Sequence, residues 1–167
     1  MVMASAPPAV LASAVRAVLD EVHDPEIPIL TIADLGVLRE VRVEAGCVTV
    51  VITPTYSACP AMHAIEQDIR KALHAAGYRD VQIETQLAPA WSTDQLSVAA
   101  HAKLRSVGIA PPAHRSTDKR VLLGQDVLCP RCASHQTERV SEFGSTACKA
   151  LYRCRSCLEP FDYFKCL

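Results

Sequence analysis

The sequence predicts an α+β protein, in which a small mixed sheet with packed helices precedes a C-terminal β-rich, Cys-rich metal ribbon. Three observations support this prediction. Segments of helical and strand periodicity alternate in the first part of the chain. A segment with a Pro-Pro pair and no periodic pattern then interrupts it. Six of the eight cysteines fall within the last 39 residues, a length too short to fold on apolar burial alone.

The interruption sets the expected domain limits: an α+β domain at residues 1–107, a linker at 108–126 and the metal ribbon at 127–167. The 167 residues are half hydrophobic and carry a net charge of −1, which gives no general reason to expect nucleic acid or a membrane surface as partner. The first residues lack the basic start and apolar run of a targeting segment, and no apolar stretch reaches the roughly 20 residues that cross a bilayer. We therefore expect a cytoplasmic protein, in which thiols stay reduced.

The first expected element is an amphipathic helix that begins after Pro7-Pro8 and ends at Asp24-Pro25, because a residue before proline is disfavoured in the helical conformation. Its apolar positions recur with a 3.6-residue period: Val10, Leu11, Ala14, Val15, Val18, Leu19 and Val22. The following loop contains three carboxylates, Asp24, Glu26 and Asp34. Loop carboxylates most often cap backbone groups or face solvent, so a functional role for them needs further evidence.

Two strands, Val37–Val43 and Cys47–Thr53, follow as a hairpin in which Gly46 supplies the positive φ that the turn needs. Cys47 is expected to be a small hydrophobe at a buried or edge position. A third strand is expected over Val81–Leu87, after a second helix.

The last helix of the first domain is expected to begin at Ser92, which would form a capping box with Gln95, and to run to about Arg105. Trp91 and Leu96 occupy the two positions of a hydrophobic staple around that cap. This explains Trp91 structurally, without a ligand.

Cys59 stands where the second strand leads into the second helix. Proline is favoured as the first helical residue, so Pro60 makes Cys59 the expected N-cap. Free amides and the helix dipole favour thiolate there, and we therefore expect a lowered pKa for Cys59. Serine, threonine or aspartate would cap better, so a thiol at this position indicates sulfur chemistry. His63, one turn further along, could share a metal with Cys59, but a lone helix histidine is usually a surface residue.

Two C-x2-C pairs in the tail, Cys129/Cys132 and Cys154/Cys157, are separated by 21 residues and predict a tetrahedral four-thiolate site, with zinc as the expected ion. Cys148 and Cys166 exceed what one such ion uses. They could form a second metal or cluster site, exchange into the main site, or stay free. An iron-sulfur cluster held by these two and two of the paired cysteines would also have four thiolate ligands.

Four motifs together resemble the domain of unknown function 59 family, also called the MIP-18 family, over about residues 9–106. The motifs are Asp24-Pro25-Glu26-Ile27-Pro28, Asp34-Leu35-Gly36, Thr53-x-Thr55 leading to Cys59-Pro60, and Pro89-x-Trp91. The resemblance implies the MIP-18-like fold, a role in iron-sulfur cluster assembly or iron trafficking, and Cys59 as the functional thiol, with Asp24, Glu26 or Asp34 nearby. His63 matches no motif of the family.

The Cys-rich tail is similar to that of the subgroup that accompanies the multicomponent phenylacetyl-coenzyme A epoxidase of phenylacetate degradation. This implies a non-catalytic accessory protein that helps to mature or maintain an iron or iron-sulfur centre of that oxygenase. The implied partners are the epoxidase subunits or their iron and iron-sulfur donors. The sequence has no dinucleotide-binding glycine pattern, no Glu-x-x-His pair for a di-iron bundle and no triad signature.

Three other classes stay open. A zinc ribbon can bind nucleic acid or protein, but the formal +2 of residues 127–167 is offset by about −2 from four thiolates around one divalent ion, which predicts weak attraction to phosphate. A rubredoxin-like electron carrier is disfavoured because no glycine follows either C-x2-C pair, where tight turns would give N–H bonds to sulfur. For a thiol enzyme using Cys59, neither His23 nor His63 lies in a recognisable catalytic context.

Overall fold

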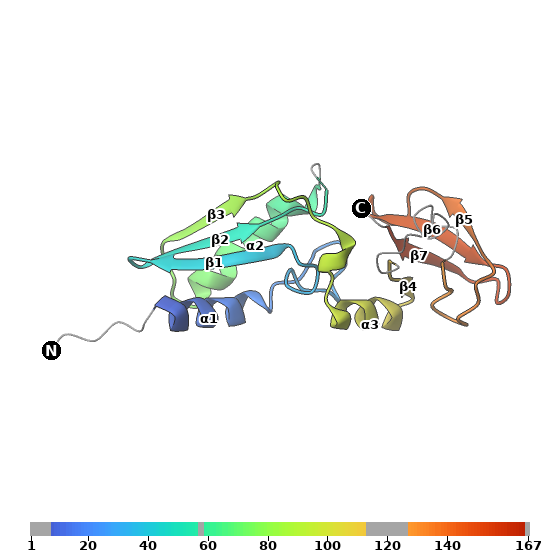
Figure 1. The fold of residues 1–167 in the computed structure, drawn as a ribbon, viewed down its shortest axis with the longest axis horizontal. Helices are drawn as coiled ribbons and strands as arrows, with labels where there is room; N and C mark the ends of the chain where they lie inside the picture. The colour runs from blue at the N-terminus through green and yellow to red at the C-terminus, as the bar shows by residue number, and fades with distance from the viewer. Residues whose placement is uncertain (1–7, 57–58, 113–126, 166–167) are drawn as a thin grey trace. The chain divides into compact units, whose positions relative to one another are not determined.

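The computed structural model describes residues 8–56, 59–112 and 127–165, and the chain divides into two compact units, Met1–Trp91 and Ser92–Leu167 (Figure 1). The expected first domain, residues 1–107, extends past this division. Most of the expected linker, residues 113–126, lies outside the described residues. No helix in the described part of the chain is long and apolar enough to span a membrane.

The first unit is a three-stranded mixed sheet with two helices, as the α+β prediction required. Strand β2 is central: β1 pairs with it antiparallel and β3 pairs with it parallel. In Figure 1, α1 runs beside β1 and α2 lies behind the strands. The elements are α1 (Pro8–Leu19), β1 (Leu38–Glu44), β2 (Cys47–Ile52), α2 (Ala61–Ala75) and β3 (Val81–Thr85).

The core of this unit lies between the sheet and its helices. Val48, Val50 and Ile52 are fully buried and alternate along β2, as the two-residue period of a strand requires. The apolar face of α2 supplies Ile65, Ile69 and Leu73. The other face of the sheet carries charges, including an ion pair between Arg42 of β1 and Glu84 of β3 with a nitrogen–oxygen distance of 2.5 Å.

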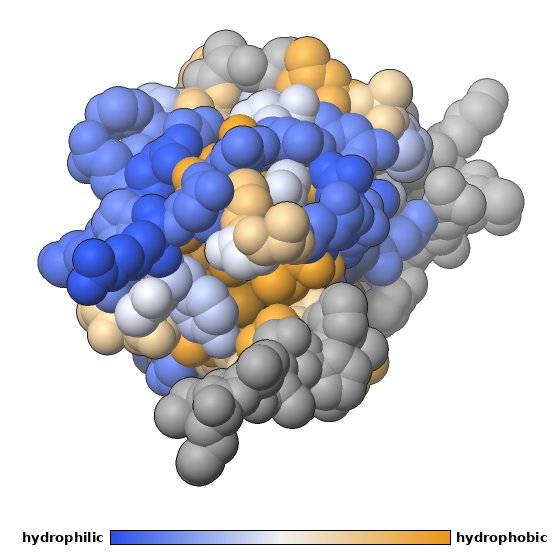
Figure 2. Space-filling view, turned by 90° about the vertical axis from the view of Figure 1, so that its left-hand side faces the viewer, coloured by the Kyte–Doolittle hydropathy of each residue, from blue (hydrophilic) through white to orange (hydrophobic). Residues whose placement is uncertain are grey.

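The β1–β2 hairpin turns at Ala45 and Gly46, which both have positive φ, 50° and 88°. Two consecutive residues of this kind are typical of the type I′ turn, whose twist matches that of the flanking strands. Gly46 is confirmed in its expected role, while the sequence did not predict the left-handed Ala45. Figure 2 views the molecule from the side on which this hairpin lies and shows mostly hydrophilic residues, with apolar ones visible between them.

The first helix ends at Leu19, earlier than the apolar period suggests. Val22 continues the period and is buried, but its amide donates to the Leu19 carbonyl in a tighter turn at 3.1 Å. The chain therefore leaves the helix before Asp24-Pro25 is reached.

In its described residues, the second unit contains a short 3₁₀ turn, one helix and a four-stranded sheet in the order β4-β7-β6-β5. Neighbouring strands are antiparallel except β4, which pairs parallel with β7. This confirms the predicted β-rich ribbon. The elements are η1 (Thr93–Gln95), α3 (Val98–Ser106), β4 (Ile109–Ala110), β5 (Thr137–Ser141), β6 (Lys149–Cys154) and β7 (Pro160–Phe164).

The predicted cap of the last helix is wrong. The Ser92 side chain makes no capping bond and the first turn closes as 3₁₀, whereas the Ser97 hydroxyl accepts from the Ala100 amide at 3.0 Å and begins α3. Two Ser-containing starts lie five residues apart, and the second one captures the helix. Trp91 is buried, as expected, and its indole N–H donates to the Leu35 carbonyl at 2.8 Å.

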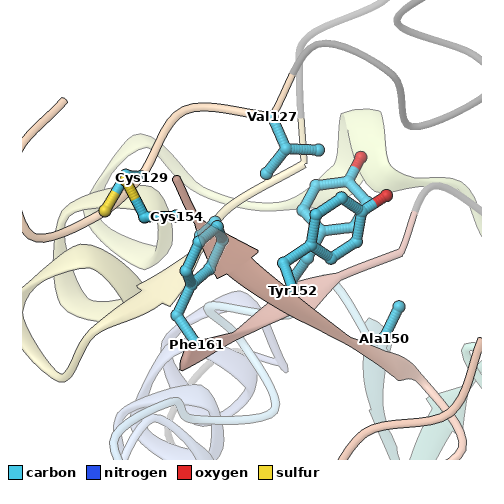
Figure 3. Close-up of a cluster of buried hydrophobic side chains, with 8 residues drawn as sticks. Val127, Cys129, Ala150, Tyr152, Cys154 and Phe161 are labelled. Atoms are coloured by element: carbon cyan, nitrogen blue, oxygen red, sulfur yellow. The ribbon is translucent and has the colours of Figure 1, made fainter. Parts of the chain in front are cut away.

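A second hydrophobic cluster forms the core of the ribbon (Figure 3). Tyr152 is central in it, with ring centroids 5.9 Å from Phe161 and 5.4 Å from Tyr163. Figure 3 shows Cys129 and Cys154 at one end of the cluster, next to Phe161. The apolar packing therefore continues directly into the cysteine site.

Candidate metal centre and thiol site

The four cysteines of the two C-x2-C pairs come together at the end of the ribbon core. Their sulfur atoms all lie within 4.8 Å of one another. The Cys129 and Cys157 sulfurs are 3.7 Å apart, and those of Cys132 and Cys154 are 3.6 Å apart. Each short contact joins one pair to the other, so the two turns face each other.

This geometry fits a tetrahedral zinc ion. Zinc–sulfur distances of about 2.3 Å place the sulfurs of a tetrahedron about 3.8 Å apart, close to the separations found here. Cys129 and Cys154 are buried while Cys132 is exposed, so the site lies at the surface of the ribbon with its inner side packed. The donor set is four thiolates, which suits zinc or iron.

Each pair forms a knuckle that closes on a residue with positive φ. Ala133, directly after Cys132, has φ 59°, and Leu158, directly after Cys157, has φ 64°. In these turns the Arg131 amide donates to the Cys129 sulfur, and the Ser156 and Cys157 amides donate to the Cys154 sulfur, each at 3.4 Å. The expectation that such bonds need glycine after the pair is wrong, because alanine and leucine adopt the left-handed conformation here.

The proton affinities of the metal-free tetrad are uneven. The pKa of Cys154 is lowered to about 6, chiefly by the backbone hydrogen bond of Cys157. For Cys132, a backbone hydrogen bond at Ser134 lowers the pKa, but burial and the neighbouring Cys154 raise it to about 12. The Cys154 thiolate thus forms readily beside the Cys132 thiol, whose raised pKa keeps it protonated, and a bound cation would take the place of that proton.

Of the two further cysteines of the tail, the structure describes Cys148 but not Cys166. Cys148 is buried, and its sulfur lies 3.1 Å from the Thr146 hydroxyl. Among the described residues, the four-cysteine cluster consists of the C-x2-C cysteines and does not include Cys148. Cys166 lies outside the described residues, so its expected role stays a prediction.

Cys59 lies just before α2, partly buried, but Pro60 rather than Cys59 occupies the cap position. The expected lowering of its pKa is wrong in direction: burial raises the pKa of Cys59, a backbone hydrogen bond at Ala61 opposes this, and the carboxylates of Glu26 and Asp24 add to the rise. The single amide at the helix start is outweighed by desolvation and by two negative charges.

The loop carboxylates have mainly local partners. An oxygen of Asp24 accepts from the amides of Glu26 and Ile27, both at 2.8 Å, and Asp34 accepts from the Thr31 amide at 3.1 Å. Both aspartates are buried and organise the loop as turn caps. Asp24 and Glu26 still act electrostatically on Cys59, whereas Asp34 is not among the groups that shift its pKa.

Cys59 and the carboxylates do not form a closed metal site. Among the described residues, the candidate metal-binding group is the set of four cysteines in the ribbon, whose ligand atoms lie within 4.8 Å of one another. His63 is exposed, and its ring lies 2.8 Å from the side chain of Gln67, one turn along the helix. A metal at Cys59 would therefore take part of its ligands from elsewhere.

The sequence did not predict a cavity of about 320 Å³ in the first unit. The segment after β2 forms one wall and the segment after β3 forms the other, so only the fold brings them together. Its lining residues are Thr53, Pro54, Thr55, Tyr56, Leu87, Ala90 and Trp91. The motif residues Thr53, Thr55 and Trp91 are the signal that could have found it.

Comparison with known proteins defines the class of protein to which this chain belongs. Residues 12–85 match a family model described as iron-sulfur cluster assembly protein, and residues 113–165 match the PaaD zinc beta ribbon domain. A solved structure of a domain of unknown function DUF59 from Bacillus anthracis covers 58% of this chain and 93% of its own, with a TM-score of 0.55 and 24% identity. This last likeness shows the fold.

Two individual relatives narrow the assignment of the chain to a family. A protein of Escherichia coli K12 named as the D component of a putative 1,2-phenylacetyl-CoA epoxidase is 52% identical over 151 residues, 90% of each chain. A protein of Porphyromonas gingivalis named Fe-S protein maturation auxiliary factor is 39% identical over 88 residues, 52% of this chain and 83% of that one. The chain belongs to the MIP-18 (DUF59) family, in the branch whose members carry the PaaD zinc ribbon.

Proposed function

We propose that this protein is a non-catalytic accessory factor of a 1,2-phenylacetyl-CoA epoxidase, and that Cys59 receives iron or an iron-sulfur cluster and passes it to a metal centre of that oxygenase. The 52% identity to a protein named as the D component of such an enzyme supports the epoxidase as the enzyme that this factor serves. The relative named an Fe-S protein maturation auxiliary factor aligns over 88 residues and supports the transfer of iron or an iron-sulfur cluster.

The observation that carries the proposal is the contrast between the two cysteine sites. The tetrad offers four sulfurs within 4.8 Å, a complete set that would hold an ion permanently. Cys59 offers one partly buried thiol influenced by the carboxylates of Asp24 and Glu26. A mixed and incomplete donor set binds iron weakly enough to release it, which a carrier requires.

The raised pKa of Cys59 fits this role. Burial and the two carboxylates keep the sulfur protonated at neutral pH, so the resting site is a neutral thiol. The cargo cation displaces that proton when it binds, and protonation helps to release it. In this proposal the zinc tetrad is structural, and the ribbon organises docking to the oxygenase subunits or to the iron donors.

The test is complementation in cells that lack the native chain but express the epoxidase subunits. Cys59→Ala is expected to leave epoxidase activity and the iron content of the purified oxygenase at least 10-fold below the wild-type level. Cys47→Ala is the matched control, because Cys47 is the other described cysteine of the first unit and lies on the β1–β2 hairpin. Full activity with Cys59→Ala would contradict the proposal.

A rubredoxin-like electron carrier is a second candidate, because amide N–H groups donate to the sulfurs of Cys129 and Cys154. Such bonds support redox-active iron held by four thiolates. Metal analysis and ultraviolet-visible spectra of anaerobically purified protein distinguish the candidates. One zinc per chain and no colour support the structural site, whereas iron with reversible bleaching by dithionite supports the carrier, and iron with sulfide indicates a cluster.

A further inference from the structure

The four cysteines of the tetrad differ in how far solvent reaches them. Cys132 is exposed, whereas Cys129 is 2% exposed and Cys154 is 0% exposed. Cys157 is partly buried and packs against the hydrophobic cluster of the ribbon. Figure 3 shows the two buried cysteines beside Phe161 of that cluster. A small reagent that arrives from solvent therefore meets Cys132 first.

Cys132 has a second thiol close to its own. Its sulfur lies 3.6 Å from the sulfur of Cys154, which is one of the two short sulfur contacts between the pairs. A disulfide bond is about 2.05 Å long, so these two sulfurs have to approach by roughly 1.5 Å to form one. Small rotations of the two side chains cover such a movement, and the exposed thiol is thus adjacent to a partner for disulfide formation.

Two contacts that involve no sulfur hold the knuckles together on this side of the tetrad. The hydroxyl oxygens of Ser134 and Ser156, each two positions after a cysteine of the short contact, lie 2.8 Å apart. The Arg155 amide donates to the Gln136 carbonyl at 2.7 Å. Because neither contact depends on a metal ligand, the two cysteines stay opposite each other when their sulfurs react.

Metal ligation keeps the tetrad in the form that oxidants attack. Cysteines that bind a metal are deprotonated, and the thiolate is the form of cysteine that reacts with peroxides. The first product is a sulfenic acid, which condenses with a neighbouring thiol to a disulfide. An exposed thiolate next to a buried one supplies both steps.

We propose that the tetrad is an oxidation site for hydroperoxides, in which Cys132 is the reacting thiolate, Cys154 resolves the product as a disulfide, and the metal is released. The Cys132 sulfur attacks a peroxide oxygen, so that the O–O bond breaks, an S–O bond forms and an alkoxide or hydroxide leaves. The Cys154 sulfur then displaces hydroxide from the Cys132 sulfenic acid and forms the S–S bond. Two thiolates lose two electrons in total, and the peroxide gains them.

The disulfide changes the ribbon because it removes two of the four ligands. The remaining pair, Cys129 and Cys157, does not complete a tetrahedral site, so the binding energy that helps to fold the ribbon is lost. A dithiol reductant reverses the change by thiol–disulfide exchange and permits the ribbon to bind zinc again. The inference goes beyond the proposed function, because it concerns the ribbon and needs no metal at Cys59.

The test uses the zinc-loaded full chain, hydrogen peroxide and a zinc indicator, with oxidised samples then alkylated and digested with trypsin. Cleavage after Arg131, Arg139, Arg153 and Arg155 places the four tetrad cysteines in four different peptides, so every pairing is distinguishable by mass. We expect zinc release to rise together with one link, between residues 132–139 and residues 154–155. A dithiol reductant and added zinc should restore both the thiols and the bound metal.

Cys132→His tests the reacting thiolate directly. Histidine is an accepted zinc ligand in a site with three cysteines, but it forms neither a sulfenic acid nor a disulfide. Zinc should stay bound in this variant, and its release by peroxide should be at least 10-fold slower than in the wild type. Cys148→Ser is the control, because Cys148 is a ribbon cysteine outside the tetrad and its loss should leave the rate unchanged.

The peptide map decides the inference even where Cys132→His fails to bind zinc. A link between residues 121–131 and 132–139, or between 121–131 and 156–165, would overturn it, since either places the disulfide on another pair of sulfurs. Retention of zinc in peroxide with all four thiols intact would overturn it as well. So would release that leaves Cys132 as a sulfinic acid without a disulfide.

Discussion

Cys59 shows how far residue-level prediction reaches. Its position between a strand and a helix, and its candidacy as the functional thiol, can be inferred from Cys59-Pro60 and the surrounding motifs. The direction of its pKa shift cannot, because burial of the thiol is the main cause of the rise, and the two carboxylates that add to it lie more than 30 residues earlier in the chain. Only the fold buries the thiol and brings the 24–36 loop to the start of α2, and burial together with the charges of Glu26 and Asp24 outweighs the local helix effect.

The raised pKa predicts slow alkylation of Cys59 near neutral pH. Thiolate is the reactive form, so the rate of modification by iodoacetamide should have a pH midpoint above that of an unperturbed cysteine. Glu26→Gln removes one of the charges that oppose ionisation and should shift the midpoint downward. Mass spectrometry of the peptide that contains Cys59, at a series of pH values, measures both curves.

Glu26→Gln is preferred to a change at Asp24, because Asp24 also caps the loop amides of Glu26 and Ile27. Glu66→Gln, on α2, is a control that should leave the midpoint unchanged, since Glu66 is not among the groups that shift Cys59. A midpoint below the ordinary value would mean that the helix start governs the thiol after all.

At the scale of elements, the cysteine knuckles were predictable as turns but not in their backbone conformation. The C-x2-C spacing fixes which four thiols meet. Nothing in the sequence marks Ala133 and Leu158 as left-handed, because this conformation is usually taken by glycine. The same limit applies to α3, where the sequence contains two serine starts and only packing decides that Ser97 caps the helix.

The left-handed Leu158 predicts a stabilising substitution. Its side chain is 61% exposed, so Leu158→Gly loses little packing while relieving the Cβ crowding at φ 64°. The free energy of unfolding of the metal-bound ribbon should rise by about 0.5–1 kcal/mol, the relief of crowding less the entropy that glycine adds to the unfolded chain. Unfolding by guanidinium, with the release of zinc to an indicator as the signal, measures this free energy.

Leu128→Gly is the matched control, since Leu128 is also an exposed leucine beside a knuckle cysteine but has no positive φ. It should not stabilise the ribbon and is expected to lower the free energy of unfolding by up to about 1 kcal/mol. An equal response of the two variants would show that strain at Leu158 has no energetic weight.

At the scale of the whole molecule, the two units differ in what stabilises them. The first buries a conventional apolar core, with fully buried residues in α1, α2 and β2. The second relies on a smaller cluster that ends in the cysteine tetrad. The composition predicted this contrast, while the expected domain limit at residue 107 stays a prediction. The contacts assign α3 to the second unit.

Removal of the metal should therefore unfold one unit and spare the other. Binding energy at a structural zinc site is folding energy, on the order of 10 kcal/mol, so a strong chelator should unfold the ribbon. Trp91, which belongs to the first unit and bonds to Leu35, should keep its buried fluorescence. Circular dichroism together with tryptophan emission, before and after chelation, separates the two responses.

Cys154→Ser should reproduce the effect of the chelator, because it removes the most buried of the four ligands. Cys148→Ser, which lies outside the tetrad, should retain zinc. Loss of the Trp91 signal on chelation would mean that the first unit depends on the metal as well.

The parallel pairing of β4 with β7 has a practical consequence for aggregation. Ile109–Ala110 covers one side of β7, a strand rich in aromatic residues, and being two residues long it presents little free edge of its own. A shortened protein that began at the zinc ribbon match, residue 113, would leave the β7 edge unpaired and open to strands of other chains. An isolated ribbon intended for metal studies should begin at Ser92, where the compact unit starts.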